Sequence, residues 1–351
     1  MSSRNKFTVV STFSGCGGSS LGYKLAGGDV RLAVEWDKHA AKTYRDNFPS
    51  TPLFYGDIGK LSIRRCCQLA GIEPGELDIF DGSPPCQGFS VCTHGRRGHK
   101  KRRRDVVKGR RSDDQRNQLF REYVRLLRGL KPKAFVMENV PGMVQGKMKL
   151  IFAECFKELK TSGYHVVAKV LSTQFYNVPQ SRSRLIFIGV RTDLEIQPTH
   201  PPPQARPICV RAAFEGLPEI ETRTLSEQGL TIWKQLKPGQ WFSEKHPKQH
   251  WFNAIKLNPN QPANTITRMV MAMGASGLFH WKHPRVLTIA EVKRISSFPD
   301  DFILSGTFKE QWARIGNSVP PRFMQAIAEH IKTEVLDVVA ADVSNTQAVG
   351  V

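Results

Sequence analysis

The stretch FDGSPPCQGFS, residues 80–90, places Cys86 directly after two prolines at the end of an apolar run. The prolines restrict the backbone, and the polar residues Gln87 and Gly88 that follow disfavour ordinary burial of the thiol. Positive charge nearby favours the thiolate, which is the nucleophilic form of cysteine. Cys86 is therefore a candidate nucleophile, with a packing residue, a metal ligand and a redox thiol as alternatives.

An acid and two arginines supply further candidate groups. Glu138 ends the apolar run AFVMENV, where an unpaired carboxylate is costly. It is either a carboxyl group that donates a proton to a substrate nitrogen, or a buried acid bonded to backbone or to an arginine. In QSRSRLIFIG, Arg182 and Arg184 share one face of an extended chain, because strand side chains alternate. They form a fork for a phosphate or a base carbonyl, or a solvated edge.

A glycine-rich turn, FSGCGGSSLG (residues 13–22), follows the first predicted strand and would let a ligand approach the backbone. Ser20 stands where the dinucleotide pattern requires its third glycine, so a pyrophosphate ligand is disfavoured. About 20 residues further on, Glu35 is suited to ribose hydroxyls and Trp36 to an adenine face. Asp57 is suited to an adenine amino group. Together they predict a nucleoside cofactor without a diphosphate, S-adenosyl-L-methionine.

The composition favours a polyanionic partner. The 351 residues carry a formal net charge of +20, with an isoelectric point near 9.9, and cations that meet phosphates release condensed counterions. No secretion signal and no run approaching the ~18 apolar residues of a membrane span is present, which predicts a cytoplasmic protein. The seven cysteines include no C-x-x-C pair, so neither a zinc site nor a disulfide framework is expected, and no metal is predicted.

Short β-rich runs alternate with helical patterns over the first half of the chain, which predicts a mostly parallel, doubly wound α/β sheet. The predicted strands are 7–13, 30–36, 77–80, 134–140, 165–172 and 184–190, and the clearest helices are 37–48 and 148–163. After Val190 the chain becomes rich in Pro, Gly, Asn and aromatic residues without a clear period. The predicted domains are a catalytic domain (1–191), a smaller loop-rich domain (192–283), a return to the catalytic domain with a final helix (284–340) and a frayed tail (341–351).

Residues 90–116 form a strongly basic stretch beside Cys86. So much like charge with little apolar content does not pack alone, which predicts a mobile loop. Its candidate contacts to nucleic acid are Ser90, Arg96, Arg97, Arg102, Arg103 and Arg104.

Six motifs occur in an order that resembles the DNA (cytosine-5)-methyltransferases. They are FSGCGGSSLG, GSPPCQGFS, MENV, the Q-x-R-x-R of QSRSR, RVLTIAEVKRISSFPDDF and RIGNSVPP, and they span roughly residues 7–191 and 284–331. The resemblance implies a Rossmann-like methyltransferase sheet with a target-recognition domain at 192–283. There, within PANTITRMVMAMG, Thr265, Thr267 and Arg268 are candidates for base contacts.

The resemblance assigns roles to matching positions. Cys86 matches the nucleophile, Glu138 the acid, and Arg182 and Arg184 the arginines near the target base. Arg285 matches the arginine that supports the recognition domain, and it is counted with the DNA-binding residues. The positions that match cofactor contacts are Phe13, Gly15, Gly17, Glu35, Trp36, Asp57, Ile58, Pro85, Leu119, Asn317 and Ser318. Ser11 departs from the family, which often has Asp there.

The implied reaction is methyl transfer from S-adenosyl-L-methionine, leaving S-adenosyl-L-homocysteine, to carbon 5 of a cytosine flipped out of double-stranded DNA in a specific sequence. Cys86 would form a transient covalent adduct, and the basic loop would close over the extruded base. We expect a monomer without membrane association, bound to the nucleoid through DNA and paired with a restriction endonuclease. An RNA cytosine-5 methyltransferase and a catalytically silent DNA-binding homologue are the alternatives.

Overall fold

A mixed seven-stranded sheet forms the centre of the computed structural model, which describes residues 6–84 and 106–342. Its strand order is β3-β2-β1-β4-β5-β8-β6. Neighbours from β3 to β5 pair in parallel, whereas β8 is antiparallel to both β5 and β6. The strands are β1 (Thr8–Thr12), β2 (Asp29–Glu35), β3 (Leu53–Tyr55), β4 (Ile79–Gly82), β5 (Ala134–Asn139), β6 (Tyr164–Ser172) and β8 (Ser183–Arg191).

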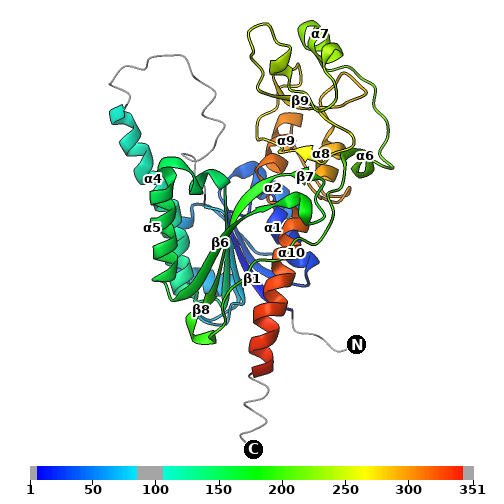
Figure 1. Cartoon of the computed structure of the whole chain (residues 1–351). Helices are drawn as coiled ribbons and strands as arrows, with labels where there is room; N and C mark the ends of the chain where they lie inside the picture. The colour runs from blue at the N-terminus through cyan, green and yellow to red at the C-terminus, as the bar shows by residue number, and fades with distance from the viewer. Residues whose placement is uncertain (1–5, 85–105, 343–351) are drawn as a thin grey trace, which may run out of the picture.

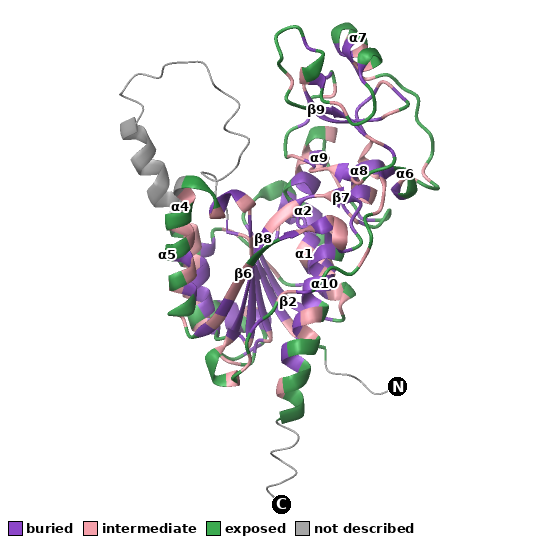
Figure 2. Cartoon of the chain, in the orientation of Figure 1, coloured by how far each residue is buried: buried purple, intermediate pink, exposed green. Residues whose placement is uncertain are grey.

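Helices cover both faces of this sheet, which confirms the predicted doubly wound α/β fold (Figure 1). One face packs against α3 (Ile63–Ala70), α4 (Val106–Leu130) and α5 (Lys149–Lys160). The other packs against α1 (Gly18–Leu25) and α10 (Pro321–Ile331). The central strands β1, β4, β5 and β8 are largely buried, whereas the edge strands β3 and β6 are partly exposed (Figure 2). Such burial is expected where helices cover both sides of a sheet.

Local signals account for several helix ends. The Asp37 side chain accepts from the Ala40 N–H at 2.8 Å and caps α2 (Lys38–Asn47). Reciprocal capping pairs open α8 (Ile289–Ile295), through Thr288, and α9 (Phe308–Asn317), through Thr307. Such caps satisfy N–H groups that have no partner within the helix. Proline at the first position of α10 fits a helix start, where no N–H is needed.

Residues 192–283 contain little regular structure, in keeping with their composition. They hold α6 (Val210–Ala213), α7 (Glu227–Gln235), β9 (Asn253–Lys256), β10 (Ala263–Asn264) and β11 (Ser276–Phe279). β9 pairs with β11, and β10 pairs with β7 (Gln180–Ser181), which precedes β8. Buried residues of this region share one hydrophobic cluster with α2, α8 and α9. This part lies beyond the carboxyl ends of the parallel strands (Figure 1).

The prediction of a loop over residues 90–116 is wrong for its last part, because residues 106–116 belong to helix α4. The apolar second half of α4 anchors the helix on the sheet, because Tyr123, Leu127 and Leu130 are fully buried. The charged first half of α4 contains Arg, Lys and Gln, which have high helix propensity. β3 and α3 were not predicted.

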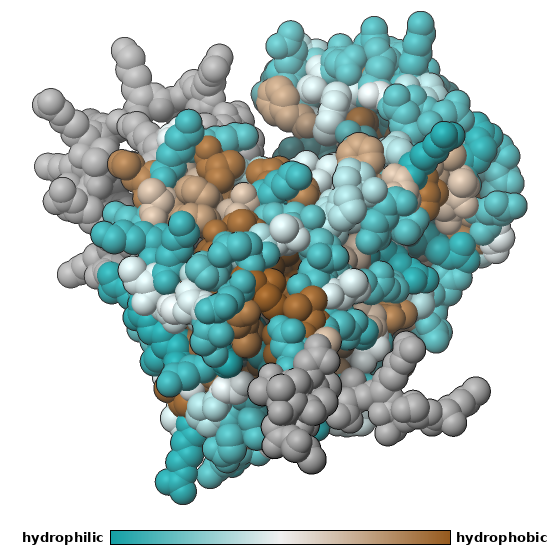
Figure 3. All heavy atoms as spheres, turned by 60° about the horizontal axis from the view of Figure 1, so that its bottom comes forward, coloured by the Kyte–Doolittle hydropathy of each residue, from teal (hydrophilic) through white to brown (hydrophobic). Residues whose placement is uncertain are grey.

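Seen from the end where the termini lie, the surface is mostly hydrophilic, with apolar residues gathered in patches (Figure 3).

Candidate active site

The candidate residues gather at the carboxyl edge of the parallel strands, where open α/β sheets bind ligands. β1, β2, β4 and β5 end there, and each is followed by a candidate segment. β8 runs in the opposite direction, so its beginning lies at the same edge. Its register pairs Glu138 with Ile186 and Asn139 with Leu185. This antiparallel register brings Arg184 beside the end of β5.

Glu138 and Arg184 form an ion pair at this edge. Arg184 Nε lies 2.6 Å from Glu138 Oε1, and only 13% and 14% of the two side chains are exposed. Arg184 Nη1 also donates to the Ser183 carbonyl at 2.7 Å. Burial lowers the pKa of Arg184, and the Glu138 carboxylate partly offsets this effect. The arginine partner considered for Glu138 from the sequence is thus Arg184, and the pair fixes the direction of the carboxyl group.

Arg182 points elsewhere and does not join Arg184 in a common fork. It is buried, and its Nη1 donates to the carbonyls of Ile266 at 3.1 Å and Gly316 at 2.9 Å. Its Nε has no hydrogen-bond partner among the described residues. Burial and the neighbouring Arg184 hold the pKa of Arg182 well below its ordinary value. Arg182 therefore joins the strand that carries Arg184 to the 192–283 region and to the end of α9.

The candidate nucleophile segment leaves from β4, between the glycine turn and Glu138. Ser83 Oγ donates to the Phe13 carbonyl at 3.4 Å, and Asn139 Nδ2 donates to the Pro84 carbonyl at 3.5 Å. Several predicted site residues follow Pro84 in the sequence and lie outside the described residues: Pro85, Cys86, Ser90, Arg96, Arg97, Arg102, Arg103 and Arg104. Their roles stay predictions.

The glycine turn after β1 depends on left-handed backbone conformations. Phe13, Gly15 and Gly17 have φ of 54°, 57° and 98°. Such positive values favour glycine, which occupies two of the three positions. A Cβ added to Gly15 would meet no atom within 4 Å, so the turn leaves space beside its backbone. At Gly18 an added Cβ would lie 2.2 Å from the Val319 carbonyl oxygen. The turn thus packs directly on the segment that leads into α10.

Glu35 is buried and holds the glycine turn in place. Its Oε2 accepts from Gly15 N–H at 2.7 Å, and its Oε1 accepts from the N–H groups of Trp36 and Asp37 at 2.8 Å. Burial raises the pKa of Glu35, and these backbone donors oppose the rise. The next residue, Trp36, is 73% exposed. An exposed tryptophan beside an open glycine turn provides an aromatic face on which a flat ligand can stack.

The other cofactor candidates lie in varied settings. Asp57 is exposed and accepts from Gly59 N–H at 2.9 Å, while Ile58 beside it is buried. Leu119 is half-buried on α4. Asn317 ends α9 with its side chain exposed, and Ser318 is buried.

Two buried contacts near this edge were not predicted from the sequence. Cys16 Sγ lies 3.0 Å from Ser318 Oγ, and burial raises the pKa of the Cys16 thiol to about 11. Asp81 accepts from Ser11 Oγ at 2.8 Å and from Tyr23 O–H at 3.2 Å. Burial raises the pKa of the Asp81 carboxyl to about 7. An acid in the otherwise apolar run before the two prolines was the available signal for the second contact.

Of the three predicted base-contacting residues, two have hydroxyl groups that bond the backbone and one, an arginine, is exposed. Thr265 Oγ1 donates to the Ser181 carbonyl at 3.2 Å, and Thr267 Oγ1 donates to the Met269 carbonyl at 3.0 Å. Both hydroxyl groups therefore brace the backbone. Arg268 is exposed.

Arg285, grouped with the DNA-binding residues, has a different place in the structure. Its side chain is only 3% exposed, and both Nη atoms bond the Glu291 carboxylate, at 2.7 and 2.8 Å. Its Nε donates to the Ile220 carbonyl at 2.6 Å. The guanidinium joins α8 to the 192–283 region and is buried, in keeping with the supporting role that the resemblance implies. Its place among the DNA-binding residues stays a prediction.

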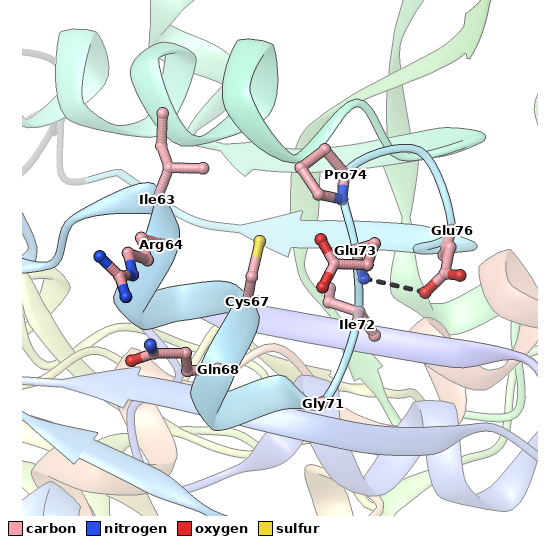
Figure 4. A pocket seen from close by; sticks show the side chains of 9 residues that line it. All are labelled: Ile63, Arg64, Cys67, Gln68, Gly71, Ile72, Glu73, Pro74 and Glu76. Atoms are coloured by element: carbon pink, nitrogen blue, oxygen red, sulfur yellow. Dashed lines mark hydrogen bonds between the residues drawn. The ribbon is translucent and has the colours of Figure 1, made fainter.

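A surface pocket elsewhere is unrelated to this edge. It lies at the turn between α3 and β4, at the opposite end of β4 from Pro84, and the Glu73 N–H donates to Glu76 Oε2 at 2.8 Å beside it (Figure 4). Its lining residues are Ile63, Arg64, Cys67, Gln68, Gly71, Ile72, Glu73, Pro74 and Glu76. Among the helices of the described ranges, none has the length and apolar character required to cross a membrane.

A doubly wound sheet with an open glycine turn, a buried acid at the end of β2 and an acid–arginine pair at one edge is typical of the Rossmann-like class. Comparison with known proteins gives the family. The model of the C-5 cytosine-specific DNA methylases matches residues 7–333. The chain belongs to this family and is a DNA (cytosine-5)-methyltransferase.

Curated relatives and solved structures agree with this assignment. Type II methyltransferase M1.HphI of Haemophilus parahaemolyticus is 33% identical over 341 residues, which cover 92% of this chain and 86% of the relative. M.XorII of Xanthomonas oryzae is 31% identical over 372 residues, covering 92% and 84%. The crystal structure of a candidate DNA modification methyltransferase from an E. coli prophage has a TM-score of 0.75 at 26% identity, covering 94% of this chain and 99% of that one.

A more distant structure shares the fold. The S. pombe Dnmt2 methyltransferase has a TM-score of 0.64 at 19% identity, covering 94% of this chain and 99% of that one.

Proposed function

We propose that the protein transfers a methyl group from S-adenosyl-L-methionine to carbon 5 of a cytosine flipped out of a specific duplex DNA sequence, through a covalent adduct on Cys86. The observation that carries the proposal is the Glu138–Arg184 pair at the carboxyl edge of the sheet, 2.6 Å apart and largely buried. The segment that contains Cys86 follows Pro84 at the same edge. The Pro84 carbonyl accepts a hydrogen bond from Asn139, the residue after Glu138.

The open glycine turn fits a nucleoside cofactor. Gly15 leaves space beside its backbone, Glu35 is the buried acid at the end of β2, and Trp36 presents an exposed ring. These residues would hold the nucleoside of S-adenosyl-L-methionine, with Asp57, Ile58, Leu119, Asn317 and Ser318 around it. When bound, this cofactor supplies an electrophilic methyl group.

The side chains would make cytosine reactive toward that methyl group. The Cys86 thiolate adds to carbon 6 while Glu138 gives a proton to ring nitrogen 3, so electron density collects on carbon 5. Arg184 orients the Glu138 carboxyl and polarises the base carbonyl. After carbon 5 is methylated, a water molecule takes the carbon 5 proton and the thiolate leaves carbon 6. Ring nitrogen 3 returns its proton to Glu138, which restores the neutral aromatic ring.

Double-stranded DNA is the proposed substrate. The net charge of +20 suits a polyanion, and the base must leave the duplex because stacking covers its faces, at a cost of a few kcal/mol. The named relatives are Type II methyltransferases. This supports the proposal that the protein acts beside a cognate restriction endonuclease and is located in the cytoplasm.

The test measures the transfer of labelled methyl groups from S-adenosyl-L-methionine to duplex DNA and, separately, to tRNA. Wild-type protein should label duplex DNA, and the variant Cys86→Ala should label neither substrate. Cys209→Ala, which removes a half-buried thiol of the 192–283 region, is the matched control and should retain activity. Undiminished labelling by Cys86→Ala, or preferential labelling of tRNA, would contradict the proposal.

A further inference from the structure

Three methionines stand exposed in a row at the end of PANTITRMVMAMG. The side chains of Met269, Met271 and Met273 are 67%, 51% and 67% exposed, whereas Val270 and Ala272 between them pack into the core. Met269 and Met271, two positions apart in extended backbone, share one face. Met273 follows within the turn that the Gly274 N–H closes on the Met271 carbonyl at 3.0 Å. The three exposed side chains are here called the methionine face. Contiguous apolar side chains in water are a feature of binding surfaces.

The backbone beneath the methionine face is held firmly. The Met269 carbonyl accepts from Ser276 Oγ at 3.2 Å, and Met271 N–H donates to the Ser276 carbonyl at 2.8 Å. The Met273 carbonyl accepts from both the N–H and the hydroxyl of Ser226, at 3.2 and 3.0 Å. The segment therefore presents flexible thioether side chains on an ordered support, which lowers the entropy cost of binding.

The methionine face continues directly from the active site. The Ile266 carbonyl accepts from Arg182, two positions before Arg184. The Thr267 carbonyl accepts from Trp312 Nε1 at 2.9 Å. Arg268, the next residue, is exposed and begins the row. The chain thus runs from Ile266, whose carbonyl is bonded by the site residue Arg182, through the exposed Arg268 to the methionines.

We infer that the methionine face enters the major groove and reads the methyl group of a thymine in the recognised sequence. The inference rests on the proposed function. Among the four unmodified bases, thymine alone presents a methyl group in the major groove, and a flexible apolar side chain contacts it without needing a hydrogen-bond partner. Arg268 and the overall positive charge suit a nucleic acid in this place better than an apolar protein surface.

The test compares DNA with and without that methyl group. A fragment of several kilobases is amplified with either dTTP or dUTP, which leaves every hydrogen-bonding group in place, and initial methylation rates are measured at limiting DNA. For wild-type protein we expect a rate about fourfold lower on the uracil DNA for each methyl group contacted. The triple variant Met269→Gln, Met271→Gln, Met273→Gln should methylate the two DNAs at equal rates.

Two controls separate the contact from a general loss of function. The triple variant with leucine at the same positions keeps the surface apolar and should keep the discrimination. Val338→Gln alters an exposed apolar residue in the final helical stretch of the described chain and should behave as wild type. Equal wild-type rates on both DNAs, or discrimination that survives the glutamine substitutions, would overturn the inference. A wild-type protein that methylates neither DNA would instead refute the proposed function.

Discussion

Replacing Glu138 by glutamine tests the pair at the centre of the site. The carboxylate lies 2.6 Å from Arg184 Nε, and it also moderates the repulsion between Arg184 and the buried Arg182. Removing one partner of a buried ion pair costs about 3–5 kcal/mol, because the other charge stays buried and unpaired. For 351 residues the entropy of unfolding is about 0.7 kcal/mol per degree, so Tm should fall by about 4–7 °C.

Calorimetry and methyl transfer together measure the two roles of Glu138. Glu138→Gln should lower the rate of methyl transfer by about 10²–10⁴, the contribution of a positioned general acid. The double variant Glu138→Gln, Arg184→Met carries no lone charge at the pair and should regain most of the lost stability. It should stay inactive, because neither the proton donor nor the guanidinium is restored.

Glu122→Gln is the matched control. Glu122 Oε2 lies 2.6 Å from Arg125 Nε on α4, and these side chains are 20% and 34% exposed. A pair three residues apart on a helix surface contributes less than about 1 kcal/mol. If Glu138→Gln lowered Tm no more than Glu122→Gln, or if the double variant were as unstable as the single one, the assigned role of the buried pair would be refuted.

Three further substitutions test the turn and the strands around it. Gly18→Ala should lower the free energy of unfolding, measured in urea, by about 1–3 kcal/mol, because the added Cβ would lie 2.2 Å from the Val319 oxygen. Gly56→Ala, whose added Cβ would have its nearest contact at 3.4 Å, is the control. Equal effects of the two substitutions would contradict the close packing of Gly18. Trp36→Ala should leave the free energy of unfolding unchanged, because Trp36 is 73% exposed. It should weaken the binding of S-adenosyl-L-methionine, measured by titration calorimetry, by about 1–3 kcal/mol. An unchanged affinity would refute stacking of the cofactor on Trp36. Burial raises the pKa of Asp81 from its ordinary value of 3.8 to about 7. Its contribution to stability should therefore decrease as pH rises from 4 to 7, by at most about 1.4 kcal/mol per pH unit. Asp81→Asn should lack this slope, and a wild-type-minus-variant difference equal at pH 5 and pH 7 would contradict it.

Much of the catalytic fold was predictable because its strands are short apolar runs separated by helical periods. The runs at 77–80 and 134–140 became β4 and β5, and the glycine turn introduced α1. β3 was missed because it has only three residues, none of them buried, which give no periodic signal. The first turns of α4 were missed because their charge suggested a loop, whereas the buried residues near Leu127 anchor the helix.

The candidate site was predictable as a set of residues and less so as an arrangement. The sequence placed Arg182 and Arg184 on one face, but β7 ends at Ser181, before the two arginines, and Arg182 turns toward Ile266 and Gly316. The antiparallel direction of β8, which brings Arg184 to Glu138, depends on tertiary packing. Burial of Arg285 against Glu291 likewise depends on how two separate regions meet.

The most direct measurement of the central claim is a search for a bond between the Cys86 sulfur and the target base. Duplex DNA in which 5-fluorocytosine replaces cytosine is incubated with the protein and S-adenosyl-L-methionine, and the products are digested and analysed by mass spectrometry. Because fluorine cannot leave carbon 5 as a proton does, we expect a stable protein–DNA adduct on the peptide that contains Cys86, absent from Cys86→Ala. Continued methylation of ordinary DNA without any adduct on the fluorinated duplex would contradict the account.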